Sequence, residues 1–416
     1  MQVASRMSPS LSSSIHGTAA LARALIAGEK GQALWAELSA RSRADPTDAD
    51  ALFDLSLMLR LSGRVEESLA LQAAALELRS VFTCRHNRPD PKGQGALNVL
   101  VMVTAADVMA NAPIDFLCED ADVTLHVLHL DAKAPLEIPP HDVAFVAVGL
   151  ADANRPMLEG LGPVLKAWAQ PVMNGAPERV LAMTRDGAAS LFADCPTLWA
   201  PTNLQVTRAV AAQLAAGALE PQALAHDFAY PMLIRPLDTH GGKGLERIED
   251  QAGWWDYLDR HPDAAFYLSP YVDYSDAHGW FPKLRITFID GRAYPTHMAL
   301  SDHWLAHYIS AGMLESAEKR ACEAAWMASF DRSFAVRHRA ALDAIATRYG
   351  VDYFSIDCAE TQDGRLLLFE ADVASLVHAL DPLEVFPYKR PAMDALFAAF
   401  HAALQRRARG VLEQAA

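Results

Sequence analysis

The sequence predicts an α/β plus α+β protein with a helical segment at its N-terminal end. Three observations support this fold class: helical periodicity over residues 17–80, short β-rich runs separated by helix-compatible segments from residue 97, and later strands that end in Asp-Gly turns. At about 150 residues per domain, the length of the chain suggests two to three domains. Hydrophobic residues make up 51% and charged residues 21% of the chain, so it can bury a core, and a disordered acidic protein is excluded.

The helical segment comes first in the chain. We expect a flexible stretch over residues 1–14 and a helical domain with its linker over residues 15–92. Residues 47–80 have the apolar periodicity of two helices, interrupted by Ser62-Gly63-Arg64, and they resemble one tetratricopeptide unit. A single unit cannot bury both of its faces. The hairpin is therefore either a helical cap on the rest of the chain or a surface that recruits a protein partner.

A small α/β domain is expected next, over residues 96–178. A polar stretch at residues 85–93 has the composition of a linker and marks the boundary before it. Three β-rich runs follow, and the helix-compatible spacing between them predicts a largely parallel sheet. The runs cover residues 97–103, 123–130 and 143–148.

Two α+β subdomains are expected after the α/β domain. The first covers residues 179–264 and contains a glycine-rich loop, and the second covers residues 265–408. In the second subdomain, Asp290-Gly291 and Asp363-Gly364 predict hairpin turns, so the sheet there should be antiparallel in part.

Charge and cysteine content restrict the partners and the compartment. Acidic residues exceed basic ones by 51 to 36, and a net charge of −15 makes nucleic acid and anionic membranes unexpected partners. The five cysteines show no C-x-x-C spacing, so neither a disulfide framework nor a zinc site is suggested. No stretch approaches the roughly 18 apolar residues of a membrane helix, and the first residues lack the apolar core of a signal peptide. We expect a cytoplasmic protein.

The glycine-rich loop is the first segment that suggests chemistry. It follows a strand that ends in Arg235-Pro236, and its residues are His240, Gly241, Gly242, Lys243 and Gly244. Glycines let the backbone approach a ligand, and consecutive N–H groups can hold phosphate oxygens, to which Lys243 adds charge. The loop is neither a Walker loop nor a Rossmann fingerprint, because Gly244 follows Lys243 and no helix follows at once.

An acidic hairpin near the C-terminal end is the second such segment. If Asp363-Gly364 is a two-residue turn, Asp357 lies opposite Glu370, and alternation puts Asp372 on the same face. Directly opposed like charges destabilise a strand pair, so a hard dication with oxygen ligands would explain the three carboxylates. The alternative is a solvated edge whose acids only keep the protein soluble.

The order of these motifs resembles the ATP-grasp superfamily, specifically its glutathione-synthetase-like carboxylate–amine ligases. The order is a strand ending in a basic residue plus Pro, a glycine loop, a hinge strand, a strand carrying Arg285, and an acid…Glu-x-acid hairpin. The resemblance covers about residues 97–400. It implies an ATP-grasp fold in which ATP lies between two α+β subdomains, preceded by a small α/β domain, the pre-ATP-grasp domain.

The resemblance also implies a role for each matched residue. Arg235 would lie on the phosphate and adenine side of the nucleotide, and the loop with Lys243 would be a mobile cover for the phosphates. Arg285 would steady the transferred phosphate. The hinge that reads adenine and ribose would be Ser269, Tyr271, Val272 and Asp273. The ligands of Mg²⁺, which Mn²⁺ could replace, would be Asp357, Glu370 and Asp372.

The chain departs from the family pattern at three positions. Arg235 stands where Lys is commoner, Gly187 where many relatives carry a second Lys, and Asp372 where Asn is more usual. Arg is a planar fork and Lys a point charge, so the geometry around phosphate should differ. These departures favour an alternative in which the chain is a nucleotide-binding scaffold with weak or no turnover that recruits a partner through its helical segment.

Substrate residues are harder to identify. Lys283 shares a strand face with Arg285, and His303 and His307 are four residues apart, which would place both on one face of a helix. The histidines could contact substrate, pack in the structure or, without a third ligand in a known spacing, bind a metal.

The function implied by the resemblance is that of an ATP-dependent ligase. A substrate carboxylate would be phosphorylated by MgATP, and an amine would attack the acyl phosphate, with release of ADP and phosphate. The carboxylate and the amine, small molecules or peptides, cannot be identified from the sequence, because fold does not set the substrate. A kinase of the same fold, without an amine acceptor, is a third alternative.

Overall fold

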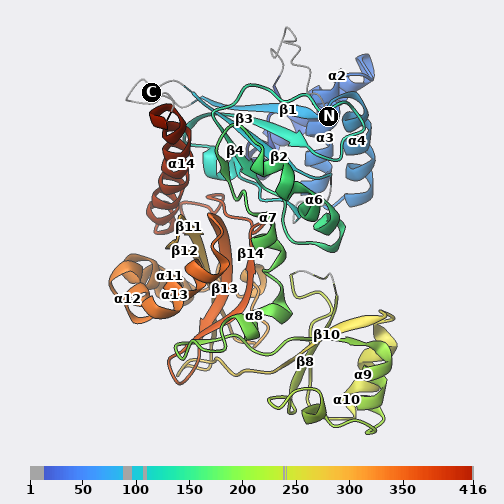
Figure 1. Cartoon of the computed structure of the whole chain (residues 1–416), viewed down its shortest axis with the longest axis vertical. Helices are drawn as coiled ribbons and strands as arrows, with labels where there is room; N and C mark the ends of the chain where they lie inside the picture. Colours follow the sequence, from blue (N-terminus) through green and yellow to red (C-terminus); the bar gives the residue numbers. More distant parts are fainter. Residues whose placement is uncertain (1–13, 88–95, 106–109, 238, 240, 415–416) are drawn as a thin grey trace.

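The computed structural model describes residues 14–87, 96–105, 110–237, 239 and 241–414. Within this part the chain forms three sheets, which we call in chain order the N-terminal sheet, the small sheet and the central sheet. Figure 1 shows the N-terminal sheet at one end of the molecule, the central sheet in the middle and the small sheet at the other end. This mixed architecture confirms the predicted α/β plus α+β class.

The N-terminal sheet is largely parallel, as predicted. Its strand order is β1-β3-β2-β4-β5, in which β2, β3, β4 and β5 run parallel and β1 pairs antiparallel with β3. The strands are β1 (Val81–Asn87), β2 (Leu97–Val103), β3 (Asp122–His129), β4 (Val143–Val146) and β5 (Val172–Met173). Strand β2 lies in the middle and is buried along most of its length, because both faces of a parallel sheet are covered.

Four helices precede this sheet, and two of them, α3 and α4, pack against it (Figure 1). They are α1 (Thr18–Ile26), α2 (Glu29–Ala44), α3 (Ala49–Leu61) and α4 (Val65–Leu78). Helices α3 and α4 form the predicted hairpin, and the side chain of Asp48 caps α3 by accepting from the N–H of Ala51 at 3.0 Å. The Phe53 ring of α3 stacks on the Phe82 ring of β1, with centroids 4.1 Å apart. The hairpin therefore covers the sheet and shares its core.

The structure differs from the expected linker at residues 85–93. Arg85, His86 and Asn87 belong to β1, which pairs with β3 along its whole length, from Val81 opposite Leu128 to Asn87 opposite Asp122. The segment 15–92 thus contributes an edge strand to the α/β sheet, and residues 88–92 lie outside the described part. The predicted stretch 1–14 lies outside it except for Ser14.

The small sheet has its own hydrophobic core. Its order is β7-β10-β8-β9, with antiparallel neighbours. The elements are β7 (Leu204–Thr207), α9 (Arg208–Ala215), β8 (Met232–Pro236), β9 (Glu246–Ile248), α10 (Gly253–Arg260) and β10 (Ala265–Pro270). Phe228, Trp254, Tyr257 and Phe266 are fully buried in a cluster separate from the main core, so this unit packs largely upon itself.

The central sheet carries the acidic hairpin. Its order is β12-β11-β13-β14-β6; only the short β6 pairs in parallel, with β14. The strands are β6 (Leu198–Trp199), β11 (Phe281–Ile289), β12 (Arg292–Ser301), β13 (Tyr353–Glu360) and β14 (Leu366–Asp372). Its helices are α11 (Ala317–Ser329), α12 (Phe334–Arg337), α13 (Arg339–Tyr349) and the long α14 (Lys389–Gln414).

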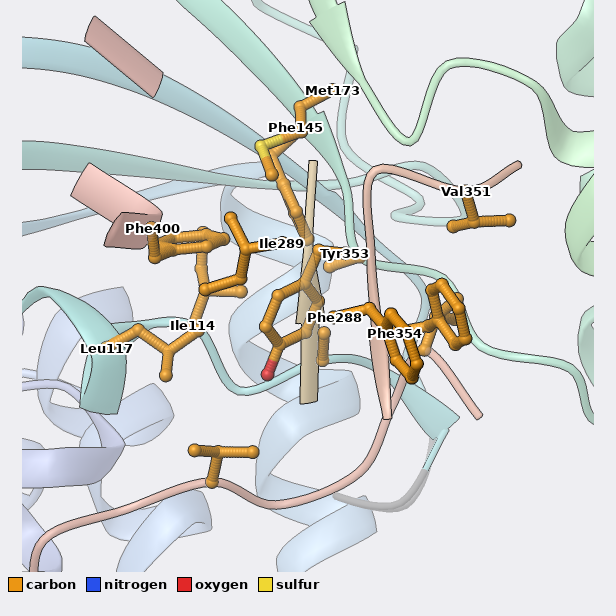
Figure 2. Packing of buried hydrophobic residues seen from close by; sticks show 14 of the residues in the cluster. Ile114, Leu117, Phe145, Met173, Phe288, Ile289, Val351, Tyr353, Phe354 and Phe400 are labelled. Atoms are coloured by element: carbon orange, nitrogen blue, oxygen red, sulfur yellow. The ribbon is translucent and has the colours of Figure 1, made fainter. Parts of the chain in front are cut away.

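The N-terminal and central sheets share one core through α14. Figure 2 shows Phe145, Met173, Phe400, Ile289 and Tyr353, which come from both sheets and from α14, packed in one cluster. The Phe400 ring lies 5.7 Å from Phe145 and 5.2 Å from Tyr353, in edge contacts typical of buried aromatic rings. The remaining helices are α5 (Asp115–Cys118), α6 (Arg155–Lys166), α7 (Pro177–Leu181) and α8 (Arg185–Leu191), and the short 3₁₀ turns are η2 (Asp152–Asn154), η3 (Pro221–Ala223), η4 (Tyr308–Ser310) and η5 (Phe330–Arg332).

The two Asp-Gly turns differ from each other. Asp290 and Gly291 form the expected two-residue turn, with φ of 48° and 79°, between paired Ile289 and Arg292. At Asp363-Gly364 the loop is longer, because Thr361 and Arg365 close it with a backbone hydrogen bond of 2.9 Å. A register shift after Asp357 then changes the pairing again.

Two further features concern the setting of the chain. Among the described residues, no helix combines the length and the apolar character needed to cross a membrane. All five cysteines are free thiols, four of them buried and Cys322 exposed.

Candidate functional site

The predicted metal residues and the predicted phosphate-steadying arginine lie in one row of the central sheet. Arg285 of β11 is opposite Asp357 of β13, and Asp357 is opposite Glu370 of β14. Asp372 lies two residues further along β14, on the same face, opposite Ser355. The structure therefore brings together all four residues that the sequence predicted to lie near the transferred phosphate.

Asp357 is the most buried of the three acids and has two cationic partners. Arg285 donates two hydrogen bonds to this carboxylate, from Nε to Oδ1 at 2.7 Å and from Nη2 to Oδ2 at 3.0 Å. Lys283 Nζ lies 2.8 Å from Asp357 Oδ2. Burial opposes ionisation of Asp357, but the charges of Arg285 and Lys283 outweigh it and lower the pKa of this carboxyl.

Glu370 is paired with Arg185, at the start of α8. Burial would raise the pKa of Glu370, but the positive charge of Arg185 lowers it to about 2. The two residues are 185 positions apart in the chain. The sequence analysis did not include Arg185 in the site, and no local pattern could have shown this contact.

Asp372 has a different environment from the other two acids. Its Oδ1 accepts a hydrogen bond from the N–H of Ala374 at 2.8 Å, and it makes no ion pair with any described residue. Burial, together with the negative charge of Glu370, raises the pKa of Asp372 to about 6. A buried carboxylate in this state is stabilised by any cation that reaches it.

Arg235 lies on the small sheet, in β8, but is electrostatically part of the same site. Its guanidinium donates to Thr239, to the hydroxyl at 3.0 and 3.2 Å and to the backbone carbonyl. Burial lowers the pKa of Arg235 to about 10, and the nearby positive charge of Arg185 adds to this effect. Two arginines from different parts of the chain therefore lie close enough to repel each other.

These residues allow the predicted magnesium site to be tested. Carboxylate oxygens are the donors that Mg²⁺ prefers, and Glu370 with Asp372 offers a pair of them beside an uncompensated charge. The oxygens of Asp357 are instead engaged by Arg285 and Lys283. In the described part of the chain, no three His, Cys, Asp or Glu side chains are grouped so that they could hold a metal ion. Glu370 and Asp372 could therefore act as ligands of a dication. Asp357 could become a third ligand only if Lys283 moved away from it.

The glycine loop lies against the segment that carries the two histidines. Gly241, Gly242 and Gly244 have φ of 62°, 75° and 67°, in the left-handed region that favours glycine. A Cβ atom on Gly241 would lie 3.3 Å from His307 Nε2, and one on Gly242 would lie 3.4 Å from Leu305 Cδ1. Backbone conformation therefore favours glycine at all three positions, and close approach adds to it at Gly244, where a Cβ would lie 2.7 Å from Pro236 Cδ.

Two other loop residues are placed less closely. Lys243 is exposed, and no ion pair joins it to another described residue. His240 lies outside the described residues.

The two histidines do not lie on a helix, in contrast to the prediction. Residues 302–305 form bends, and the 3₁₀ turn η4 starts only at Tyr308. His303 Nδ1 accepts from the N–H of Leu305 at 3.2 Å, whereas His307 faces Gly241. The i, i+4 argument was wrong because this segment follows β12 as an irregular loop, where the helical period does not apply.

The predicted hinge connects the small and central sheets. Ser269 is paired with Leu233 at the end of β10, and the N–H of Tyr271 donates to the carbonyl of Pro231 at 3.3 Å. The Tyr271 ring is 4.7 Å from the Arg247 guanidinium carbon, a cation–π contact. Val272 packs against the buried cluster of Tyr274, Ala359 and Leu367, whereas Asp273 accepts from the N–H of Ser275 at 2.9 Å.

A second polar cluster, which the sequence analysis missed, lies beside Arg285. His297 is opposite Arg285 in the pairing of β12 with β11, and its ring lies 4.8 Å from that of Tyr308. Lys389, at the start of α14, contacts the Tyr308 hydroxyl and lies 3.6 Å from buried Glu323. The glutamate also accepts from the Tyr388 hydroxyl at 2.7 Å. These residues come from four separate elements, so no sequence motif joins them.

Comparison with solved structures finds similarity to ATP-grasp ligases at low sequence identity. D-alanyl-alanine synthetase A from Vibrio cholerae aligns with a TM-score of 0.46 and 11% identity, over 75% of this chain and 100% of that chain. D-alanine–D-alanine ligase from Bacillus anthracis, complexed with ATP, gives 0.44 and 11%, over 77% and 100%. A RimK-domain ATP-grasp protein from Sphaerobacter thermophilus gives 0.41 and 11%, over 74% and 99%. No protein-family model and no curated protein matches the chain.

Proposed function

We propose that the chain is an ATP-grasp carboxylate–amine ligase whose phosphate site is formed by Arg185 and Arg235. The observation that supports this best is the difference between these two arginines: Arg185 is paired with Glu370, whereas among the described residues Arg235 donates hydrogen bonds only to the neutral Thr239. The positive charge of Arg185 also lowers the pKa of the buried Arg235, so an added anion would stabilise the charged form of Arg235. A nucleotide polyphosphate supplies several negative charges and forms strong hydrogen bonds with guanidinium groups.

The carboxylates of the central sheet support the same proposal, because they could bind the metal ion that accompanies the nucleotide. Glu370 and Asp372 would hold Mg²⁺, which when bound neutralises charge on the phosphates and polarises the phosphoryl group. Asp372, with its pKa raised to about 6, would gain the cation that it lacks. Asp357 would keep Arg285 oriented through its two-armed contact, and would reach the metal only after Lys283 has left it.

The reaction that we propose proceeds in two steps. A carboxylate oxygen of the first substrate attacks the γ-phosphorus of ATP, so that the bond to the β-phosphate oxygen breaks and ADP leaves. The amine of the second substrate then attacks the carbonyl carbon of the acyl phosphate, loses a proton and expels inorganic phosphate. The role of Arg285 is to stabilise charge on the transferred phosphoryl group, which is largely a matter of position and electrostatics.

We also propose roles for the other residues that the sequence predicted to belong to the site. The backbone from Ser269 to Val272 would read adenine, Asp273 would reach ribose, and the loop with Gly241, Gly242, Lys243 and Gly244 would cover the phosphates. Lys283 and His307 would contact a substrate, since Lys283 lies beside Asp357 and His307 lies against the glycine loop. His303 is held within its own loop and has less support.

The substrates and the setting are proposed only as classes. The net charge of −15 favours neither nucleic acid nor a membrane surface as a partner. We propose small-molecule or peptide carboxylates and amines as substrates, in a reducing cytoplasm that keeps the five cysteines free. The scaffold alternative has no support from a specific contact, because the hairpin of α3 and α4 packs on the chain itself.

The proposal is tested by a screen of carboxylate and amine pairs with Mg²⁺ and ATP. A ligase releases ADP and phosphate only with both substrates, and mass spectrometry shows a product whose mass is the sum of the two less water. Glu370→Gln should cut turnover about a hundredfold or more, since it removes a ligand charge. The matched change Glu249→Gln alters an exposed glutamate of the small sheet and should have no effect. ADP release with equal rates in both variants would contradict the assignment.

A further inference from the structure

A cavity of about 120 Å³ lies between the N-terminal helices and the N-terminal sheet, away from the residues assigned to nucleotide and metal. Helices α3 and α4 form one wall, and β2 and β3 form the other. Most of the lining is apolar, with Phe53, Val103 and Val127 among the contributors. The cavity lies at the carboxyl ends of β2 and β3, the end of a parallel sheet at which ligands usually bind.

His129, the last residue of β3, is a polar group in this wall. Its side chain is 3% exposed, and neither ring nitrogen has a hydrogen-bond partner. Burial lowers the pKa of His129 to about 3, so the ring is neutral and offers one donor and one acceptor. Buried polar groups without a partner are uncommon, and each calls for a bound water or ligand.

Gln72 of α4 lines the opposite wall. It is 8% exposed, and its amide forms no hydrogen bond with another described residue. An amide group also offers both donors and acceptors. Two complementary groups, from a helix and from a strand that meet only in the folded chain, therefore face one cavity without partners.

The charged groups around the cavity do not select an ion. Arg60 and Asp115, of opposite sign, both line it. Arg60 Nε donates to Ser68 Oγ at 3.1 Å, and Asp115 accepts from the N–H of Ala19 at 2.7 Å. Because the two charges are of opposite sign, the lining carries no net charge, which favours a neutral head group over an ion.

We propose that this cavity is a binding site for a small neutral molecule with an aliphatic body and a carboxamide or hydroxyl head. The volume corresponds to about four water molecules, at about 30 Å³ each, or to an aliphatic amide of similar size. The head would bond to His129 and Gln72, and the body would pack on Phe53, Val103 and Val127. The site is independent of the proposed ligase activity.

Titration of the full chain with isobutyramide, followed by calorimetry, tests the proposal. Isobutyrate has the same shape and a negative charge, and serves as the comparison ligand. We expect one isobutyramide per chain, and about tenfold weaker binding of isobutyrate, because a charge buried without a new partner is costly. Equal or tighter binding of isobutyrate would overturn the assignment of a neutral ligand.

Variants locate the binding. Gln72→Leu should weaken isobutyramide about tenfold, because it removes a partner of the head group. Gln32→Leu, on the exposed side of α2, should not change it. His129→Phe is the second site variant, and its melting temperature shows whether the fold persists. A crystal structure that shows only ordered water between His129 and Gln72 at saturating amide would overturn the proposal, as would equal affinity in the two glutamine variants.

Discussion

At the scale of single residues, the three acids of the central sheet differ in how their charge is compensated. Asp357 is held by Arg285 and Lys283, and Glu370 by Arg185, whereas Asp372 has only a backbone N–H. The pKa values follow these partners, since that of Glu370 is lowered to about 2 and that of Asp372 is raised to about 6. The requirement for an added cation is therefore concentrated at Asp372.

Lys283→Met tests whether the ammonium group competes with a dication for Asp357. Methionine keeps the length of the side chain and removes the charge. We expect the affinity for Mn²⁺, measured without nucleotide by electron paramagnetic resonance, to rise about tenfold, the effect of about 1.4 kcal/mol. Lys133→Met removes an exposed lysine of the N-terminal region and should leave the affinity unchanged. Equal Mn²⁺ affinity in the two variants would show that Lys283 does not restrict the metal.

His129 predicts a specific dependence of stability on pH. Burial lowers the pKa of His129 to about 3, whereas a histidine in the unfolded chain titrates near 6.5. Between these values the unfolded state binds more protons, so the contribution of His129 to stability falls as pH falls, by about 1.4 kcal/mol per pH unit. Urea unfolding at several pH values gives the free energy of unfolding as a function of pH. In His129→Leu this free energy should change less steeply with pH than in the wild-type protein, by the same amount. His278→Leu is the control, because it changes an exposed ring. If it altered the pH dependence of the unfolding free energy as much as His129→Leu does, burial of His129 would not be the cause.

At the scale of elements, the contact between the glycine loop and the loop at residues 301–307 joins the small sheet to the central sheet. Gly242 lies against Leu305, and Gly241 lies against His307. A cover for phosphates that touches a candidate substrate loop would order both segments together. Both glycines are favoured by their positive φ, and both leave room for the side chains of the other loop.

Gly242→Ala tests the contact between the glycine loop and Leu305 when compared with Gly279→Ala. Both glycines have positive φ, 75° and 78°, but a Cβ at position 279 would meet nothing within 4 Å. Both variants should lose a similar amount of stability, about 1 kcal/mol, from backbone strain. Only Gly242→Ala should also lower kcat of ATP turnover, which steady-state kinetics and melting temperatures distinguish. An equal loss of kcat in both would show that the loop contact is unimportant.

The edge strand β1 makes the N-terminal segment part of the α/β unit. Removal of residues 1–92 would delete β1 together with Phe53 and Phe82, which pack in the main core, and would expose the edge of β3. We expect this truncation to be insoluble or to unfold at much lower temperature, which circular dichroism would measure. A soluble truncated protein that binds nucleotide with wild-type affinity would contradict this expectation.

The acidic hairpin shows how far local pattern reasoning reaches. A two-residue turn at Asp363-Gly364 predicts Asp357 opposite Glu370, and the structure has this pair. The turn itself is longer, closed by Thr361 and Arg365, and the register shift next to Asp357 restores the predicted pairing. Alternation and charge thus located the face correctly, while the turn type and the bulge depend on backbone packing that no short motif specifies.

Long-range contacts set the limit of prediction from sequence. Arg185 reaches Glu370, and Lys389 reaches Tyr308 and Glu323, only because separate elements fold together. The edge strand β1 was read as a linker because its Arg85-His86-Asn87 end is polar, although it pairs with β3. The core strands β2 and β3 were predictable because their apolar runs are buried on both faces.

At the scale of the whole molecule, the described part of the chain has one large hydrophobic core and a smaller separate one in the small sheet. The N-terminal and central sheets share a core through α14, as Phe145, Tyr353 and Phe400 show (Figure 2). The small sheet has its own core around Trp254 and Phe266. A ligand bound between the small and central sheets would join two units that are otherwise stabilised separately.

The measurement that tests this account most directly is calorimetric binding of AMP, ADP and a non-hydrolysable ATP analogue with Mg²⁺. If Arg185 and Arg235 form a phosphate site, affinity should increase from AMP to ADP to the ATP analogue. In Arg235→Met the ratio of the affinities for ADP and AMP should be smaller than in the wild-type protein, by about tenfold or more. Arg292→Met, at the exposed end of β12, should keep the full gain. Equal affinity for AMP and ADP in the wild-type protein, or no binding of any of the three, would contradict the central claim.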